Sequence, residues 1–199
     1  MQLNIAEQVS WQEDFNHFPS RPDFEVLSEE DKGELFGKIE FLPQPTNQNR
    51  EAIKILNGWE ENHIVSLRVP EIQHLLKPHH RGEIRLHKAI VENFLGFWKE
   101  LERSGLMDQV LTWNGSYCSR LVRGSTKYLS THAYGTAFDI NSKWNPFGKS
   151  VADFGDTGCV FDIVEVANRF GFFWGGHFRS VSDGMHFEFA DSSKLRESN

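Results

Sequence analysis

The sequence has few cysteines, no long apolar run and no excess of basic charge. Cys118 and Cys159 are the only cysteines among 199 residues, too few for a disulfide framework or a cysteine zinc site, so we expect two free thiols. No run of apolar side chains exceeds three residues, which excludes a membrane-spanning helix. The net charge of −7 argues against nucleic-acid binding, which requires a basic patch.

Residues 1–15 lack the basic and apolar regions of a signal peptide, which fits either a cytoplasmic protein or one whose leader has been removed. The localisation is left open by the sequence.

Aromatic residues are plentiful: the chain has 17 Phe and 6 Trp, and 39% of its residues are hydrophobic. That content is typical of a globular protein, and the length fits one domain with an extension. Residues 1–75 are mixed in pattern and interrupted by proline and asparagine, which predicts an irregular N-terminal extension packed on the core. We expect the main domain to span residues 76–199.

Few helices and several short strands, without a regular strand–helix alternation, predict an α+β domain. Apolar residues spaced by three or four predict the longest helix over 83–104, stopped by Gly105, and a second one over 161–170. We expect strands at residues 63–69, 109–113, 172–174 and 186–190, with Asn114-Gly115 as a turn.

Two short segments carry residues with metal-binding chemistry. In the first, Leu129–Asn141, His132 and Asp139 are separated by seven residues. On one straight helix they would lie about 10 Å apart along the axis, too far to share an ion easily. A turn at Gly135 followed by an extended 137–140 segment would instead bring them together, with Phe138 packing on the opposite face.

In the second segment, Ser182–Ala190, an extended chain would place His186 and Glu188 on one face. Asp183 precedes them in a Ser-Asp-Gly turn. Two histidines and one carboxylate can form an open catalytic zinc shell, and a further carboxylate nearby would serve metal-assisted hydrolysis. Taken singly, each of these residues also has a purely structural interpretation. A lone histidine can be packed in the core, Asp139 can cap a strand end or pair with an arginine, and Asp183 can form an Asx turn.

Together, the two segments resemble a known family. Ser130, His132, Gly135, Ala137 and Asp139, followed by Asp183-x-x-His186-Phe187-Glu188, are similar to the motifs of the zinc D-alanyl-D-alanine carboxypeptidases and L-alanyl-D-glutamate endopeptidases, which share the hedgehog-type zinc fold. These enzymes cut peptidoglycan stem peptides in bacterial cell walls. The stretch from Gly171 to Gly176 is also similar to a segment of the endopeptidase branch. The resemblance covers residues 114–190 or so.

The resemblance implies Zn²⁺ bound by His132, Asp139 and His186, on a small antiparallel sheet packed against helices. It makes Asp183 the general base, where many carboxypeptidase members use glutamate. Glu188 is the alternative base, although orienting a ligand histidine suits it better.

A cation for the developing oxyanion is expected upstream of the first ligand. The family position looks more like Arg120, with Arg123 as the alternative; both are also interpretable as salt-bridge residues, and Arg123 additionally as substrate-binding. Trp174 has two interpretations, core packing or an aromatic wall for the substrate.

The implied partner is a peptidoglycan stem peptide, cut at L-Ala–D-Glu or, as the alternative, at D-Ala–D-Ala. A protein acting on the wall would be secreted, periplasmic or phage-released. A non-catalytic zinc-binding or wall-binding module is the competing class of function. The oligomeric state is not readable from the sequence.

Overall fold

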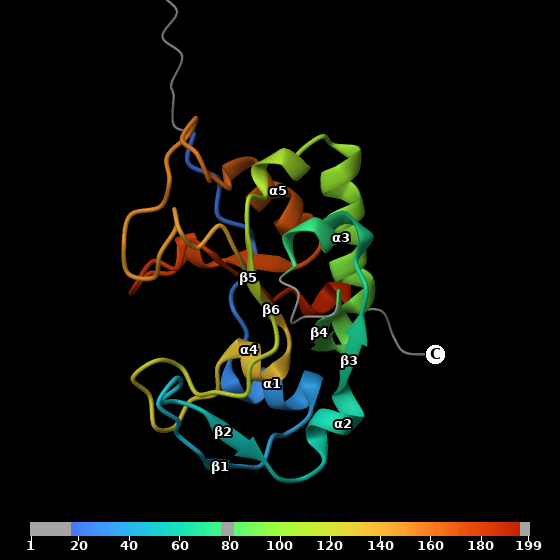
Figure 1. Cartoon of the computed structure of the whole chain (residues 1–199), viewed down its shortest axis with the longest axis vertical. Helices are drawn as coiled ribbons and strands as arrows, with labels where there is room; N and C mark the ends of the chain where they lie inside the picture. The colour runs from blue at the N-terminus through green and yellow to red at the C-terminus, as the bar shows by residue number, and fades with distance from the viewer. Residues whose placement is uncertain (1–16, 77–81, 196–199) are drawn as a thin grey trace, which may run out of the picture.

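A computed structural model describes residues 17–76 and 82–195 of the chain (Figure 1). In chain order the elements are α1 (Glu29–Phe36), β1 (Phe41–Pro43), β2 (Ile53–Ile55), α2 (Trp59–His63), β3 (Ile64–Leu67), η1 (Pro70–Leu75), β4 (Ile84–His87), η3 (Lys88–Ile90), α3 (Val91–Arg103), η4 (Met107–Gln109), β5 (Trp113–Gly115), α4 (Thr131–Tyr134), β6 (Ala137–Ile140), α5 (Phe161–Arg169), β7 (Phe172–Trp174), η5 (Gly175–His177), β8 (His186–Phe189) and η6 (Ser192–Lys194).

The central element is a four-stranded antiparallel sheet in the order β5-β6-β8-β7. Two smaller antiparallel pairs, β1-β2 and β3-β4, lie outside it. Several helices pack around these sheets, so the predicted α+β class is confirmed.

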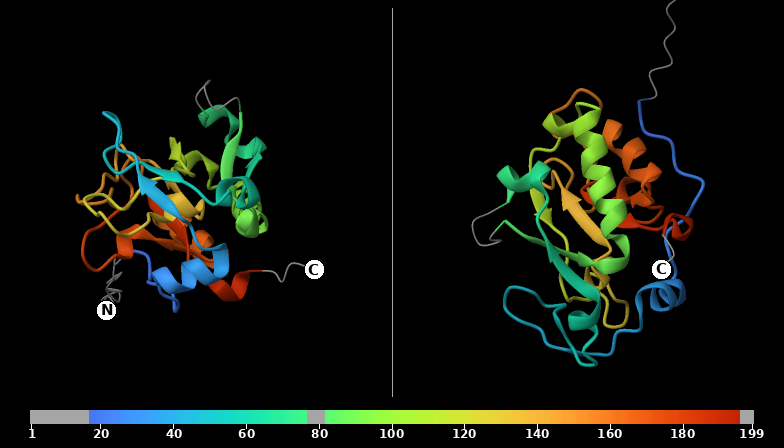
Figure 2. Two further views of the ribbon diagram at one scale, coloured as in Figure 1. Left: turned by 90° about the horizontal axis from the view of Figure 1, so that it is seen from below. Right: turned by 90° about the vertical axis from the view of Figure 1, so that its right-hand side faces the viewer.

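One face of the central sheet forms the aromatic core. Phe138 of β6 stacks on Phe187 of β8 with ring centroids 5.3 Å apart. Helix α3 lays Phe94 and Phe97 against Phe138, each with ring centroids 5.4 Å apart. Figure 2 shows α3 and α5 running side by side next to the sheet. Because side chains alternate along a strand, the opposite face of β6 and β8 is free to carry polar groups.

The predicted helix over 83–104 is wrong at its start. Residues Ile84–His87 form strand β4, which pairs antiparallel with Ile64–Leu67 of β3. The spacing of Leu86, Ile90 and Phe94 fits a helix, but Ile84 and Leu86 also alternate as in a strand, and both are buried. Pairing with β3 decides between the two periods, and the helix α3 begins only at Val91.

The predicted turn at Asn114-Gly115 is also wrong, because both residues lie in β5, opposite the end of β6. The strand expected at 109–113 is shifted to Trp113–Gly115 for the same reason. Helix α5 and strands β3, β7 and β8 lie where the pattern predicts them. Cys118 and Cys159 are both free thiols, as expected.

The N-terminal segment is more structured than its composition indicates. It contains α1, the β1-β2 pair and α2, and Phe36 and Trp59 belong to the same buried cluster as Phe94. The boundary between residues 75 and 76 stays a prediction, and residues 1–15, judged above for a signal sequence, lie outside the described part of the chain. None of the helices within 17–76 and 82–195 has the length and apolar character that crossing a bilayer requires.

Candidate metal centre

A short helix, a glycine turn and a strand position the first two polar residues of the site. Helix α4 begins after Ser130, whose Oγ accepts a hydrogen bond from the backbone N–H of His132 (3.3 Å). It ends at Gly135, which adopts a left-handed conformation with φ of +68°. A Cβ there would lie 2.8 Å from the backbone nitrogen of His87, so only glycine fits. The chain then enters β6, and the predicted turn and extension are confirmed.

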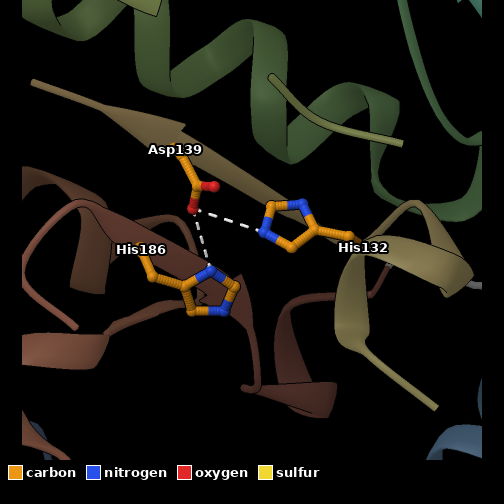
Figure 3. A group of neighbouring side chains, drawn as sticks. All are labelled: His132, Asp139 and His186. Atoms are coloured by element: carbon orange, nitrogen blue, oxygen red, sulfur yellow. Dashed lines mark hydrogen bonds and ion pairs between the residues drawn. The ribbon is translucent and has the colours of Figure 1, made fainter. Parts of the chain in front are cut away.

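That turn brings His132 and Asp139 together, with His132 Nε2 3.3 Å from Asp139 Oδ1. Strand β8 supplies the third residue, because Asp139 lies directly opposite His186 in the β6-β8 ladder. His186 Nδ1 is 3.0 Å from the same Oδ1 atom. One ligand atom from each of the three residues lies within 4.8 Å of the other two (Figure 3), a spacing that allows one metal ion to be bound by all three.

The other nitrogen of each imidazole has its own hydrogen-bond partner. His132 Nδ1 lies 2.6 Å from the backbone carbonyl of Ser116, to which it must donate, so Nε2 keeps its lone pair. His186 Nε2 lies 3.0 Å from Glu188 Oε2, which also accepts a hydrogen bond from Thr131 Oγ1 (3.0 Å). Such contacts fix the tautomer of metal-binding histidines and leave the metal-facing nitrogen unprotonated.

The electrostatics of the three residues fit a cation site. Burial alone would raise the pKa of Asp139, but the adjacent imidazoles of His132 and His186 hold that pKa well below its usual range. Burial opposes protonation of His186, yet hydrogen bonds to Asp139 and Glu188 raise its pKa to about 10. Both shifts show that this cluster favours positive charge, which a divalent cation would supply. The donor set of two imidazoles and one carboxylate suits zinc.

Asp183 lies in the loop before β8, beside this cluster. Its backbone N–H donates to the carbonyl of Gly175, and its own carbonyl accepts from the N–H of His186, both at 3.0 Å. A Cβ on Gly175 would lie 2.5 Å from the Asp183 carbonyl oxygen, so a glycine is needed for this approach. Asp183 Oδ1 is buried without a hydrogen-bond partner among the described residues, and burial raises the pKa of its carboxyl group.

Asp183 lines a cleft of about 250 Å³ together with two residues of the cluster, Asp139 and His186. Asp139, Asp183, His186 and Glu188 contribute its acidic and imidazole groups, while Arg120, Arg123 and Lys32 contribute cations. Arg120 Nη1 donates to the carbonyl of Leu121 (3.1 Å), and the Arg123 guanidinium lies over the exposed ring of Phe147. Both arginines thus reach the cleft, and the choice between them as oxyanion partner stays a prediction.

The interpretation of Trp174 as an aromatic wall for the substrate does not agree with the structure. Its side chain is fully buried, its Nε1 donates to the carbonyl of Gly184 (2.8 Å), and it is not among the residues that line the cleft. Trp174 lies on the core face of β7, opposite Phe187. Its second interpretation, core packing, is the one that agrees with the structure.

Sequence reasoning missed two residues of the site. Thr131 Oγ1 is within hydrogen-bond distance of both His186 Nε2 and Glu188 Oε2. Because Thr131 directly precedes His132 in the first motif, the sequence could have indicated it. Lys32 lines the cleft from the N-terminal extension, about a hundred residues before the first motif, and no local pattern identifies it.

Residues 123–189 match the family model described as D-alanyl-D-alanine carboxypeptidase. The match includes His132, Asp139, Asp183 and His186, and it confirms the resemblance seen in the sequence. Arg120 lies just outside it. A search of curated proteins found no match to the chain.

Proposed function

We propose that this chain is a zinc-dependent peptidase that cleaves peptidoglycan stem peptides. Its residues 123–189 match the model of the D-alanyl-D-alanine carboxypeptidase family. The observation that carries the proposal is a His-Asp-His cluster of which Asp139 and His186 line a cleft, together with an additional carboxylate in that cleft, Asp183, whose Oδ1 is buried. When bound, zinc would supply the Lewis acidity that activates water near neutral pH and polarises the scissile carbonyl. His132, Asp139 and His186 would hold it.

Asp183 is assigned the proton transfers. Its Oδ1, which has no hydrogen-bond partner within the described part of the chain, can accept a proton from the attacking water and then deliver it to the departing amine. A pKa raised by burial favours this role, because a more basic carboxylate accepts a proton more readily. Glu188 is less suited to act as the base, since its Oε2 is already engaged by His186 and Thr131.

Arg120 or Arg123 is assigned to the oxygen of the tetrahedral intermediate. A guanidinium aimed at developing negative charge is worth most in a cleft from which water is partly excluded. Arg123 also lies near enough to Asp183 to lower its pKa, which opposes the effect of burial. Its removal would therefore affect both the oxyanion and the base.

We propose L-Ala–D-Glu as the bond that is cut. An aspartate at position 183, where many carboxypeptidase members have glutamate, and the Gly171–Gly176 stretch both favour the endopeptidase branch. The description of the matching family model favours D-Ala–D-Ala as the alternative.

The test is digestion of purified peptidoglycan by the zinc-loaded protein, followed by mass spectrometry of the released fragments. New amine termini on D-Glu would identify the endopeptidase, and free D-Ala the carboxypeptidase. Asp183→Ala serves as the inactive control and should still bind zinc. A wild-type protein that binds zinc but releases nothing would instead be a non-catalytic binding module.

A further inference from the structure

Helix α1 brings a cation from the N-terminal extension into the proposed catalytic cleft. Helix α1 lies next to α4, the helix that carries His132 (Figure 1), and the rings of Phe36 in α1 and Tyr134 in α4 have centroids 6.4 Å apart. Ser28 begins α1 with a capping box in which its Oγ accepts from the Asp31 N–H (3.1 Å) and Asp31 accepts in return from Ser28. This anchors the first turn, which is followed directly by Lys32.

Lys32 is an unusual lysine because only 6% of its surface is exposed. Its ammonium pairs with Glu29 and lies over the ring of Tyr134, 5.8 Å from the ring centroid. Glu29 is the one carboxylate within ion-pair distance of it among the described residues. Since an ammonium has three N–H donors, a single such partner leaves donors for a further anion.

Lys32 shares the cleft with the residues around the His186 ring. Asp139 faces one nitrogen of the His186 ring and Glu188 faces the other, so Glu188 lies across the ring from Asp139. Lys32 lines the same cleft as Glu188 and Thr131.

We propose that Lys32 is a specificity-determining residue that binds a substrate carboxylate in this cleft. The proposal rests on the proposed function, because stem peptides carry several free carboxylates along a short chain. It also gives the N-terminal extension a role in substrate choice. The exposed Val26 and the adjoining Leu27 line the same cleft and would pack against the aliphatic part of the bound residue.

The test compares synthetic stem peptides whose carboxyl groups next to the cleaved residues are either free or amidated. We expect wild-type protein to prefer the free acids, and Lys32→Met to lower kcat/KM for the acids by about tenfold or more while changing the amides less than twofold. Lys32→Arg should keep most of the preference. Lys38→Met, at an exposed lysine just after α1, is the matched control and should behave as wild type.

Calorimetric titration of the same peptides into the zinc-loaded protein separates this proposal from the proposed function. If the wild-type protein cleaves no peptide yet binds the acids more tightly than the amides, and Lys32→Met removes that difference, the peptidase assignment fails and the role of Lys32 stands. Equal losses on acids and amides, or no loss at all in Lys32→Met, would overturn the role of Lys32 whatever the catalytic result.

Discussion

The carboxylate of Glu188 offers a sharp test of how the metal centre is built. Glu188 Oε2 lies 3.0 Å from His186 Nε2 and 3.0 Å from Thr131 Oγ1, so the isosteric change Glu188→Gln removes the charge while keeping an acceptor in place. A hydrogen bond to a charged group contributes about 1.5–3 kcal/mol, against about 0.5–1.5 kcal/mol for a neutral pair. The loss of about 1–1.5 kcal/mol corresponds to a zinc Kd weaker by about five- to twelvefold.

The assay is competition for zinc between the protein and a chromophoric chelator, combined with kcat measured at saturating zinc. Glu165→Gln, at an exposed position of α5, is the matched control and should leave both quantities unchanged. We expect Glu188→Gln to weaken zinc binding while keeping kcat within about threefold of the wild type, since such partners mainly orient the ligand histidine. An unchanged Kd together with lost turnover would refute this reasoning and make Glu188 the general base.

Three further changes test other parts of the structure. His132→Ala should abolish stoichiometric zinc in elemental analysis, because Asp139 and His186 alone hold an ion poorly; retained zinc would place the site elsewhere. Gly135→Ala should lower the free energy of unfolding, measured in denaturant titrations, by about 2 kcal/mol or more beyond the loss in Gly105→Ala. Both glycines have positive φ, but of the two only Gly135 would bring its added Cβ against neighbouring atoms. Equal losses in the two variants would contradict this reasoning. Burial lowers the pKa of His87 to about 4, below its unfolded value of about 6.5, so its contribution to stability is complete above pH 6.5 and falls as the pH drops towards 4. Between those pH values the wild type should lose up to about 3 kcal/mol more stability than His87→Gln, and parallel pH profiles would show that His87 is not responsible.

The sequence was most informative where local pattern and tertiary structure agree. The turn at Gly135 and the extended segment after it predicted that His132 and Asp139 meet, and the structure has them in contact. The resemblance added His186, which lies opposite Asp139 in the sheet. Strand β4 could not be recognised in this way. Its apolar residues satisfy two periods at once, and only its pairing with β3, nearly twenty residues earlier in the chain, selects the extended form.

Other features depend on contacts that no local pattern encodes. Trp174 lies in a glycine-rich stretch that suggested an exposed edge, yet the register of β7 against β8 directs its ring into the core. Lys32 reaches the cleft only because α1 packs next to α4. The residues around a lysine in the sequence do not show whether it is exposed or lines a cleft. Only its position in the fold distinguishes the two cases.

The pairing of Asp139 with His186 between β6 and β8 has a consequence for folding of the protein. If β8 slipped by one residue against β6, its histidine and glutamate would point into the aromatic layer and its phenylalanines into water. The cation-binding cage therefore exists only after the two strands have found their correct alignment. Cobalt, whose visible spectrum changes on coordination, would accordingly report the moment at which refolding molecules acquire native strand pairing.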